Sequence, residues 1–240
     1  MLMITQVNIL AKVQNVSFKN MVSRQLHRSV QDLIWLGGTV LYKGWFNLKC
    51  AGLEHLPQDR GYIIAANHIS HLDGPAIVAA QGKHMSQVHS LAAKDYFFNS
   101  PVKSWFCQNF LNMIPFSRRG KFLDCLCLCQ AALAQKKAIL FFPEGTRSKT
   151  GSLQPLKLGL GKLVMTLKVP VVPTYIYGSY QALPKGTWRP KKHPIHIRFG
   201  APLDFSRYWQ QQSLTDNRQV YRAIVDDVSS SILNLKDLEV

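Results

Sequence analysis

The chain has 240 residues, of which 47% are hydrophobic and 18% are charged. This share of apolar residues can form a folded core and excludes a largely disordered chain. The charge is unequal, with 29 Lys and Arg residues against 13 Asp and Glu residues, a formal net charge of +16. Such a basic balance favours phosphate-bearing ligands, nucleic acid, an anionic membrane surface or an acidic protein as partners.

The N-terminal segment, residues 1–48, differs in character from the rest of the chain. From Phe18 to Trp45 its apolar residues recur close to helical spacing, with Lys and Arg among them. The pair Gly37-Gly38 predicts a break between two helices. Such a basic amphipathic segment either lies in a lipid interface or packs on the main domain, which we expect to span residues 49–240.

Membrane-spanning and secretory segments are not predicted. No stretch reaches the roughly 18 consecutive apolar residues that a spanning helix needs. The apolar residues at the start of the chain have no basic residues before them, unlike a secretory signal. The expected location is therefore peripheral, on the cytoplasmic face of a membrane.

After residue 48, short apolar runs alternate with helical patterns. The predicted strands are residues 46–51, 62–66, 88–93, 113–117, 138–142, 169–177 and 195–199. The predicted helices are residues 76–80, 102–110, 122–136, 159–167 and 219–235. This alternation predicts an α/β fold with a largely parallel mixed sheet flanked by helices. The functional site of such a sheet lies beyond the carboxyl ends of its strands.

The loop after the strand at 62–66 carries a candidate general base. It has the sequence NHISHLDGP, in which His68 and Asp73 are five residues apart. A strand-to-helix turn can fold the carboxylate back onto the imidazole, which fixes its tautomer and makes the other ring nitrogen a better base. The alternatives are that Asp73 caps the next helix, or that His71 is the base.

The loop after the strand at 138–142 is rich in groups that bind anions. It has the sequence PEGTRS, in which Arg147 offers a planar fork for phosphate or carboxylate. Thr146 and Ser148 add hydroxyls, and Gly145 permits close approach to the backbone. Glu144 is either an organising ion-pair partner or a hydrogen-bond acceptor for a polyol. The alternative for the whole loop is a polar turn.

The order of these two loops resembles that of a known family. NHISHLD at residues 67–73, followed by FPEGTRS at 142–148, is similar to the motifs of the glycerolipid acyltransferases, which include the 1-acylglycerol-3-phosphate acyltransferases. NMIPFSR at 112–118 and VPVVP at 169–173 resemble the two other motifs of that family. Asn112 stands where the family usually has glycine, but asparagine tolerates a left-handed backbone. The resemblance covers roughly residues 46–200.

The resemblance implies roles for individual residues. His68 would be the general base on the acceptor hydroxyl, Asp73 would orient it, and the hydroxyl oxygen would attack the thioester without an acyl-enzyme. Arg118, with Arg119 as an alternative, would bind phosphate in the second motif. The substrate-binding residues implied in the third motif are Glu144, Gly145, Thr146, Arg147 and Ser148.

The implied activity is acyl transfer from acyl-CoA or acyl carrier protein to the free hydroxyl of 1-acylglycerol 3-phosphate. Its implied partners are a lysophospholipid, an acyl thioester and an anionic membrane surface, with acyl carrier protein as a further candidate. No metal or other cofactor is expected, since the five cysteines lack the spacing of a zinc site. Glycerol 3-phosphate or another lysolipid is the alternative acceptor. A non-catalytic protein that binds lipid or nucleic acid is the alternative of a different class; the absence of a nucleic-acid-binding signature disfavours nucleic acid as a partner.

Two basic segments lie beside these motifs. Lys157 and Lys162 flank Gly159 and Gly161, which either bind a phosphate at a helix start or simply begin the helix. Residues 184–198 contain several Lys and Arg residues, one Trp and no acidic residue. This stretch is either a solvated loop or a surface for lipid headgroups, an acidic carrier protein or nucleic acid.

Overall fold

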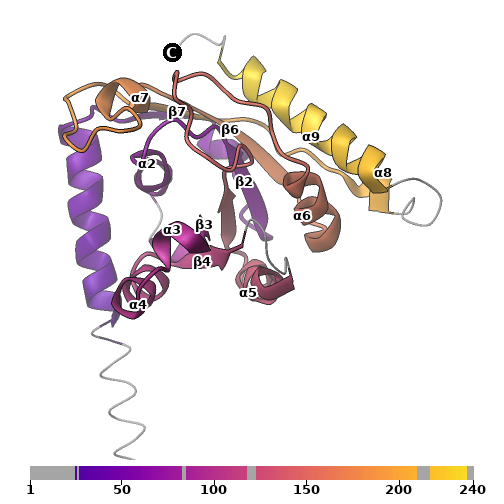
Figure 1. Ribbon diagram of the computed structural model, residues 1–240, viewed down its shortest axis with the longest axis horizontal. Helices are drawn as coiled ribbons and strands as arrows, with labels where there is room; N and C mark the ends of the chain where they lie inside the picture. The colour runs from indigo at the N-terminus through magenta and orange to yellow at the C-terminus, as the bar shows by residue number, and fades with distance from the viewer. Residues whose placement is uncertain (1–24, 26, 83–84, 118–122, 210–216, 237–240) are drawn as a thin grey trace, which may run out of the picture.

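The computed structural model describes residues 25, 27–82, 85–117, 123–209 and 217–236. A helix over residues 27–44 precedes a central sheet that is flanked by further helices (Figure 1). The strands are β1 (Lys49–Ala51), β2 (Tyr62–Ala66), β3 (Val88–Ala93), β4 (Met113–Phe116), β5 (Ala138–Phe141), β6 (Val171–Tyr177) and β7 (His196–Phe199). The labelled helices are η1 (Leu53–His55), α2 (Asp73–Ala80), η2 (Met85–Gln87), α3 (Lys94–Phe97), α4 (Pro101–Asn109), α5 (Leu123–Ala134), α6 (Gly159–Leu167), α7 (Ser179–Ala182), α8 (Ser206–Trp209) and α9 (Asn217–Asn234).

The seven strands form one mixed sheet in the order β1-β7-β6-β2-β5-β3-β4. All neighbouring strands run parallel except β6 and β7, which are antiparallel. The predicted fold class is therefore confirmed. Because β2, β5 and β6 are adjacent and parallel, the loops after Ala66, Phe141 and Tyr177 emerge at the same edge of the sheet.

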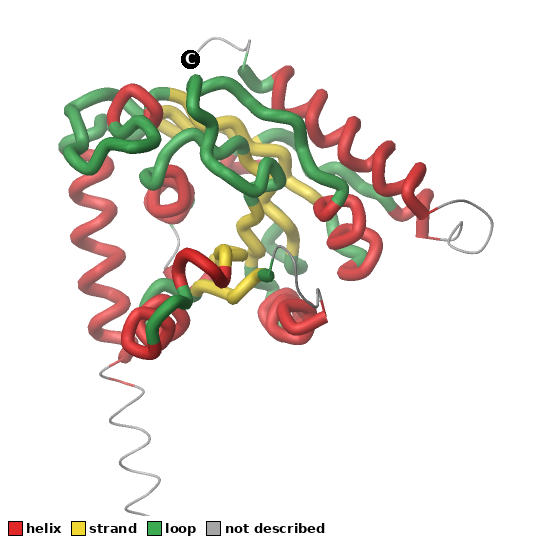
Figure 2. The backbone as a smooth tube through the Cα atoms, viewed as in Figure 1, coloured by secondary structure: helices red, strands yellow, loops and turns green. Residues whose placement is uncertain are grey.

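Two hydrophobic cores lie on opposite faces of the sheet, which Figure 2 shows between two groups of helices. The side chains of β2 alternate between them, with Ile63 in one core and Ile64 in the other. The first core includes residues of α5, α6 and α9, and the second includes α2 and the end of the N-terminal helix. Every residue of β2 is buried, which explains its uninterrupted apolar sequence.

The N-terminal helix is continuous, so the predicted break at Gly37-Gly38 is wrong. A glycine inside a helix costs only about 1 kcal/mol, and contacts on both sides of the pair hold this helix in place. Gln31 Nε2 donates hydrogen bonds to Asn109 O at 2.8 Å and to Asn112 Oδ1 at 3.2 Å. Past the C-terminal end of the helix, Phe46 is buried in the second core.

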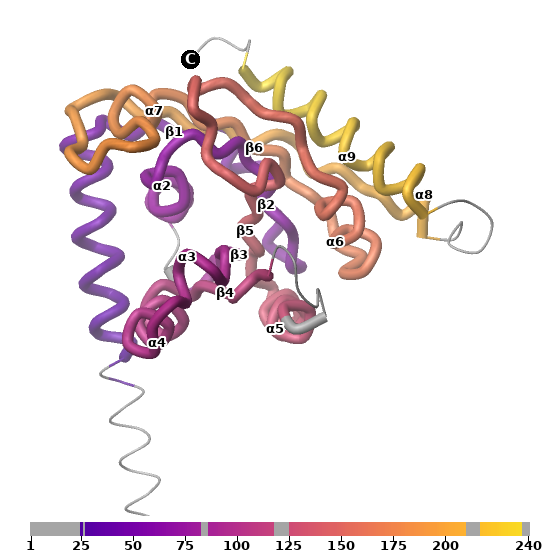
Figure 3. The backbone as a smooth tube through the Cα atoms, viewed as in Figure 1, coloured from indigo at the N-terminus to yellow at the C-terminus, as the bar shows by residue number. Residues whose placement is uncertain are grey.

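The same helix therefore packs against two distant parts of the domain. Figure 3 shows it beside α4 at one end and beside the segment between α7 and β7 at the other. His27 stacks on Phe110 with ring centroids 4.6 Å apart, and Ile195 N donates to Phe46 O at 2.9 Å. Its outer face still exposes large apolar side chains, namely Leu33, Leu36, Val40 and Leu41.

The turn before β4 contains the residue that departs from the family pattern. Asn112 has φ of 49°, the left-handed conformation that favours glycine. The expectation that asparagine preserves this turn is confirmed. Arg118 and Arg119, the predicted phosphate ligands of the second motif, lie outside the described residues.

Candidate active site

The loop after β2 begins with a residue that ties it to the neighbouring strand. Asn67 Nδ2 donates to Ile176 O at 2.9 Å, and Ile176 N donates to Asn67 Oδ1 at 2.7 Å. Asn67 is fully buried, so this paired contact replaces the backbone bonds lost where β2 ends. The next residue, His68, is thereby held at the edge of the sheet.

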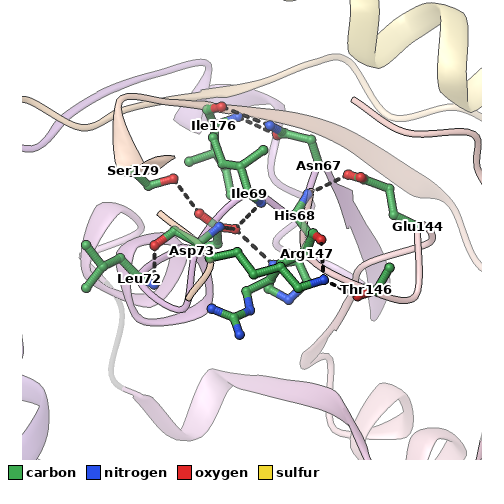
Figure 4. A network of polar contacts seen from close by, with 12 residues as sticks. Asn67, His68, Ile69, Leu72, Asp73, Glu144, Thr146, Arg147, Ile176 and Ser179 are labelled. Carbon is green, nitrogen blue, oxygen red and sulfur yellow. Dashed lines mark hydrogen bonds and ion pairs between the residues drawn. The ribbon is translucent and has the colours of Figure 1, made fainter. Parts of the chain in front are cut away.

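His68 and Asp73 form the predicted pair. His68 Nδ1 lies 2.9 Å from Asp73 Oδ2, and Figure 4 shows the carboxylate facing the ring. The same oxygen accepts hydrogen bonds from Ile69 N at 2.7 Å and Ser70 N at 2.8 Å. Asp73 is the first residue of α2 and its side chain is fully buried, whereas that of His68 is 21% exposed. The chain thus folds back within five residues, as the spacing predicted.

The second carboxylate oxygen of Asp73 is held by a residue that sequence reasoning missed. Ser179 Oγ donates to Asp73 Oδ1 at 2.5 Å, and Ser179 is fully buried at the start of α7. The preceding Gly178 has φ of 85°, and a Cβ there would lie 1.9 Å from Pro194 O. The only available signal was the position of this loop after β6, at the predicted edge of the sheet.

The third-motif loop holds the backbone of His68 on both sides. His68 N donates to Glu144 Oε1 at 2.6 Å, and Ser148 N donates to His68 O at 2.7 Å. Glu144 Oε2 accepts from Gln154 N at 3.1 Å and from Gln154 Nε2 at 2.9 Å. Glu144 and Ser148 are both buried behind the wall of the site, and burial raises the pKa of the Glu144 carboxyl. In this structure they hold the backbone of His68 and do not line the cavity in front of its ring.

The alternative base, His71, occupies a different environment. Its Nε2 lies 3.1 Å from the Tyr96 hydroxyl, and the two rings stack at 5.6 Å. Burial, followed by the positive charge of Arg147, lowers the pKa of His71. The His68 ring instead stacks on Phe142 at 4.1 Å and receives the carboxylate. The geometry therefore gives the carboxylate partner to His68.

A cavity of about 660 Å³ opens in front of His68. Its apolar wall comes from the N-terminal helix, α2, β3 and β4, and includes Ile34, Trp35, Val78, Leu91 and Met113. Its basic residues are Arg147, Lys157 and Lys185. This volume lies within the range of small-molecule sites, and the lining suits a ligand with an apolar chain and an anionic group.

The basic residues gather around the third-motif loop. Lys185 Nζ donates to Thr146 Oγ1 at 3.1 Å and to Arg147 O at 3.0 Å. Gly145 has φ of 71°, and a Cβ there would lie 2.8 Å from Lys157 Nζ. Arg147 Nη1 is buried and has no hydrogen-bond partner among the described residues. Gly145, Thr146 and Arg147 therefore border the cavity as predicted, together with two lysines that the motifs do not contain.

Among the described residues, no group of three or more His, Cys, Asp and Glu side chains is placed to hold a metal ion. None of the five cysteines, all of which are described, forms a disulfide, and Cys125 and Cys129 are buried within α5. The described residues of the site provide a histidine–carboxylate pair, buried hydrogen bonds and the three cations Arg147, Lys157 and Lys185.

Comparison with known proteins shows the family. Residues 47–177 match the family model described as Acyltransferase. The chain belongs to this acyltransferase family. A 1-acyl-sn-glycerol-3-phosphate acyltransferase of the Brassica napus chloroplast is 32% identical over 167 residues, which cover 68% of this chain and 46% of that relative. A Bacillus subtilis protein of the same name is 28% identical over 156 residues, covering 65% of this chain and 73% of the relative.

A solved structure shares the acyltransferase fold. The crystal structure of the 1-acyl-sn-glycerophosphate acyltransferase PlsC from Thermotoga maritima superposes with a TM-score of 0.65 and 23% identity. The match covers 91% of this chain and 84% of that structure. At this sequence identity the structural match shows the fold alone. The chain spans about half the length of the plant chloroplast relatives that it matches.

Proposed function

We propose that this chain transfers a fatty acyl group from an acyl thioester to the free hydroxyl of 1-acylglycerol 3-phosphate, which produces phosphatidate. The observation that carries the proposal is the His68–Asp73 pair, which opens onto a cavity with apolar walls and three basic residues. The names of the Brassica and Bacillus relatives specify the same acceptor for those proteins.

The hydrogen bonds around Asp73 set the tautomer of His68. Asp73 already accepts from two backbone N–H groups and from Ser179, so it acts as an acceptor toward His68 Nδ1 as well. A proton on Nδ1 leaves Nε2 unprotonated and able to take the proton of an alcohol. The buried carboxylate then stabilises the imidazolium that forms.

The reaction is a direct transfer with balanced protons. As Nε2 of His68 takes the hydroxyl proton, the acceptor oxygen attacks the thioester carbonyl and a carbon–oxygen bond forms. The carbon–sulfur bond then breaks, and the thiolate leaves with the proton returned by the imidazolium. General base catalysis of this kind contributes about 10²–10⁴-fold. No metal or other cofactor takes part in this scheme.

The two serines that hydrogen-bond Asp73 support a mechanism without an acyl-enzyme. Ser70 Oγ donates to Leu183 O at 2.8 Å, and Ser179 Oγ donates to Asp73. Both serines are fully buried, so neither hydroxyl borders the cavity as a nucleophile hydrogen-bonded to His68.

The cavity walls match the two halves of the acceptor. Arg147 Nη1, which has no hydrogen-bond partner among the described residues, can donate to phosphate, and each charge-assisted hydrogen bond of this kind is worth about 1.5–3 kcal/mol. The apolar wall can bury the acyl chains, with acyl-CoA or acyl carrier protein as the donor. Arg118 would add a second guanidinium.

The proposed location is the anionic cytoplasmic face of a membrane. In the part of the chain that the structure describes, no helix is long and apolar enough to span a bilayer. The N-terminal helix exposes 69% of Leu33 and 64% of Val40 on its outer face, and the chain carries a net charge of +16. Exposed apolar residues together with basic charge support peripheral binding.

The test is thiol release from acyl-CoA, or from acyl carrier protein, on addition of lysophosphatidate. We expect His68→Ala to lose at least about a hundredfold in kcat. His71→Ala is the matched comparison, because His71 lies in the same loop and hydrogen-bonds Tyr96 instead of Asp73. Equal turnover by wild type and His68→Ala would refute the base assignment, and a wild type inactive on every lysophospholipid would refute the activity.

A further inference from the structure

Lys185 lies beyond the residues that the family model matches. That match ends at residue 177, whereas Lys185 follows α7 in the basic stretch at 184–198. The chain nevertheless returns to the site at this point, and Lys185 is half-buried and lines the cavity. The loop after α7 therefore contributes a cation to a site whose motifs end before it.

The position of this cation is defined by two hydrogen bonds. Lys185 Nζ donates to Thr146 Oγ1 and Arg147 O, the side chain and backbone of consecutive residues in the third-motif loop. An ammonium group has three N–H donors, and these two contacts among the described residues leave one for a ligand. The lysine is thus oriented by the protein rather than free on the surface.

The positive charges around Lys185 favour binding of an anion. Lys157 lies over Gly145, and Arg147 Nη1 is buried without a hydrogen-bond partner among the described residues. The described residues that line the cavity include no Asp or Glu. Three cations gathered without a facing carboxylate are stabilised when a group with more than one negative charge binds between them.

We propose that Lys185 binds the phosphate monoester of the acceptor, together with Arg147 and Lys157. This assignment rests on the proposed function and adds to it the residue through which the enzyme selects a phosphate-bearing acceptor. Lys185 is then a substrate-binding residue supplied from outside the four motifs.

The chemistry of the substrates favours the acceptor over the donor as the source of this phosphate. In 1-acylglycerol 3-phosphate, the hydroxyl and the phosphate are on neighbouring carbons. In acyl-CoA, the whole pantetheine chain separates the thioester from the nearest phosphate. Arg147, whose carbonyl holds Lys185, precedes Ser148, which hydrogen-bonds the backbone of His68. A phosphate this close to the base belongs to the molecule that the base deprotonates.

The experiment compares Lys185→Met and Lys185→Arg with wild type, using a short-chain lysophosphatidate that is soluble as a monomer. Lys192→Met is the matched control, because Lys192 is an exposed lysine of the same loop that does not line the cavity. KM is measured for the acceptor and for acyl-CoA separately. Calorimetry measures binding of the same acceptor without donor, and thermal melting checks the fold of each variant.

The expected result is specific to the acceptor. Lys185→Met raises the acceptor KM and Kd by about tenfold or more, which corresponds to the loss of one charge-assisted hydrogen bond. Lys185→Arg keeps the charge and restores part of the binding. The KM for acyl-CoA stays within about twofold of wild type, since one cation is lost from the acceptor site alone. Lys192→Met behaves as wild type.

Three outcomes would overturn the assignment. A raised KM for acyl-CoA with an unchanged acceptor KM would place the donor's phosphate at Lys185. A lower kcat with both KM values and the acceptor Kd unchanged would show that Lys185 only positions the loop. Unchanged kinetics and binding would remove it from the site. Failure of the proposed function is distinguishable, because a wild type that binds the acceptor without transferring an acyl group would still show the Lys185 effect by calorimetry.

Discussion

Substitutions of the buried Asp73 can distinguish its contribution to stability from its contribution to catalysis. Its Oδ2 accepts from the backbone N–H groups of Ile69 and Ser70 as well as from His68. In Asp73→Ala, both backbone donors stay buried without an acceptor, at about 1–3 kcal/mol each. The combined cost of about 2–6 kcal/mol is a large part of the roughly 5–15 kcal/mol that stabilises a typical domain. We expect this variant to melt far below wild type.

Asp73→Asn has a different expected outcome. The amide oxygen can still accept from Ile69 and Ser70, and the new Nδ2 faces the hydroxyl of Ser179, which can rotate to accept. The fold should therefore persist. A neutral amide does not stabilise the imidazolium of His68, so kcat should fall by about 10²–10⁴-fold.

The assay pairs thermal melting of both variants with thiol release from acyl-CoA in the presence of lysophosphatidate. Because the proposed mechanism makes His68 and Asp73 one catalytic unit, His68→Ala combined with Asp73→Asn should be little worse than either substitution alone. Near wild-type turnover by Asp73→Asn would refute the role of the charge. A wild-type melting temperature for Asp73→Ala would refute the burial argument. Independent, multiplicative losses in the double variant would refute the pairing.

Three further predictions test other parts of the structure. In Gly161→Ala the new Cβ would lie 2.5 Å from backbone atoms of α9. The free energy of unfolding, measured by denaturation, should therefore fall by about 1–3 kcal/mol. Gly159→Ala is the control: a Cβ at Gly159 would have no atom within 4 Å, so this variant should be as stable as wild type in the same assay. Gly145→Ala strains a residue at φ of 71° and displaces Lys157, so acceptor KM should rise in steady-state kinetics. Burial lowers the pKa of His89 to about 4. The unfolded state therefore binds more protons than the folded state below about pH 6.5, and the free energy of unfolding falls as the pH drops toward about 4. The melting temperature of His89→Gln should depend less on pH over this range.

The parts of the fold predicted from sequence are those in which local pattern and burial agree. The bounds predicted for β2, β3 and α6 match the structure at both ends. β2 is a fully buried apolar run, and α6 begins at Gly159 and carries an apolar pattern with helical spacing. The short helices α3, α7 and α8 were missed, because four residues carry too little periodicity to distinguish a helical turn from a loop.

The errors arise where tertiary contacts decide the local conformation. The strand predicted to begin at Phe46 begins at Lys49, because Phe46 is buried as the anchor of the N-terminal helix before the sheet starts. The break predicted at Gly37-Gly38 fails for the related reason that contacts on both sides hold the helix together. Glycine propensity is a small term beside such packing.

The same distinction between local pattern and tertiary contacts applies to the predictions of the candidate site. The His68–Asp73 contact was predictable, since it closes within one turn and five residues. Ser179 was not, because it reaches the site from α7, where no short motif marks it. Lys185 lies in the basic stretch at 184–198, whose composition did not indicate that it returns to the third-motif loop. The Gly159-x-Gly161 pattern, considered as a phosphate cradle, has a packing role at its second glycine, against Tyr221.

Part of the cavity wall comes from residues outside the region that the family model matches. The matched region contains His68, Asp73 and the loop that carries Arg147. The helix over 27–44 precedes that region and contributes Ile34 and Trp35 to the apolar wall, while the loop after α7 contributes Lys185 to the basic side. Substitution of Ile34 or Lys185 can alter chain or headgroup preference while leaving the His68–Asp73 geometry intact, because Lys185 hydrogen-bonds Thr146 and Arg147 and Ile34 has no polar side-chain group. Acceptor selectivity in this acyltransferase should therefore vary independently of its catalytic motif.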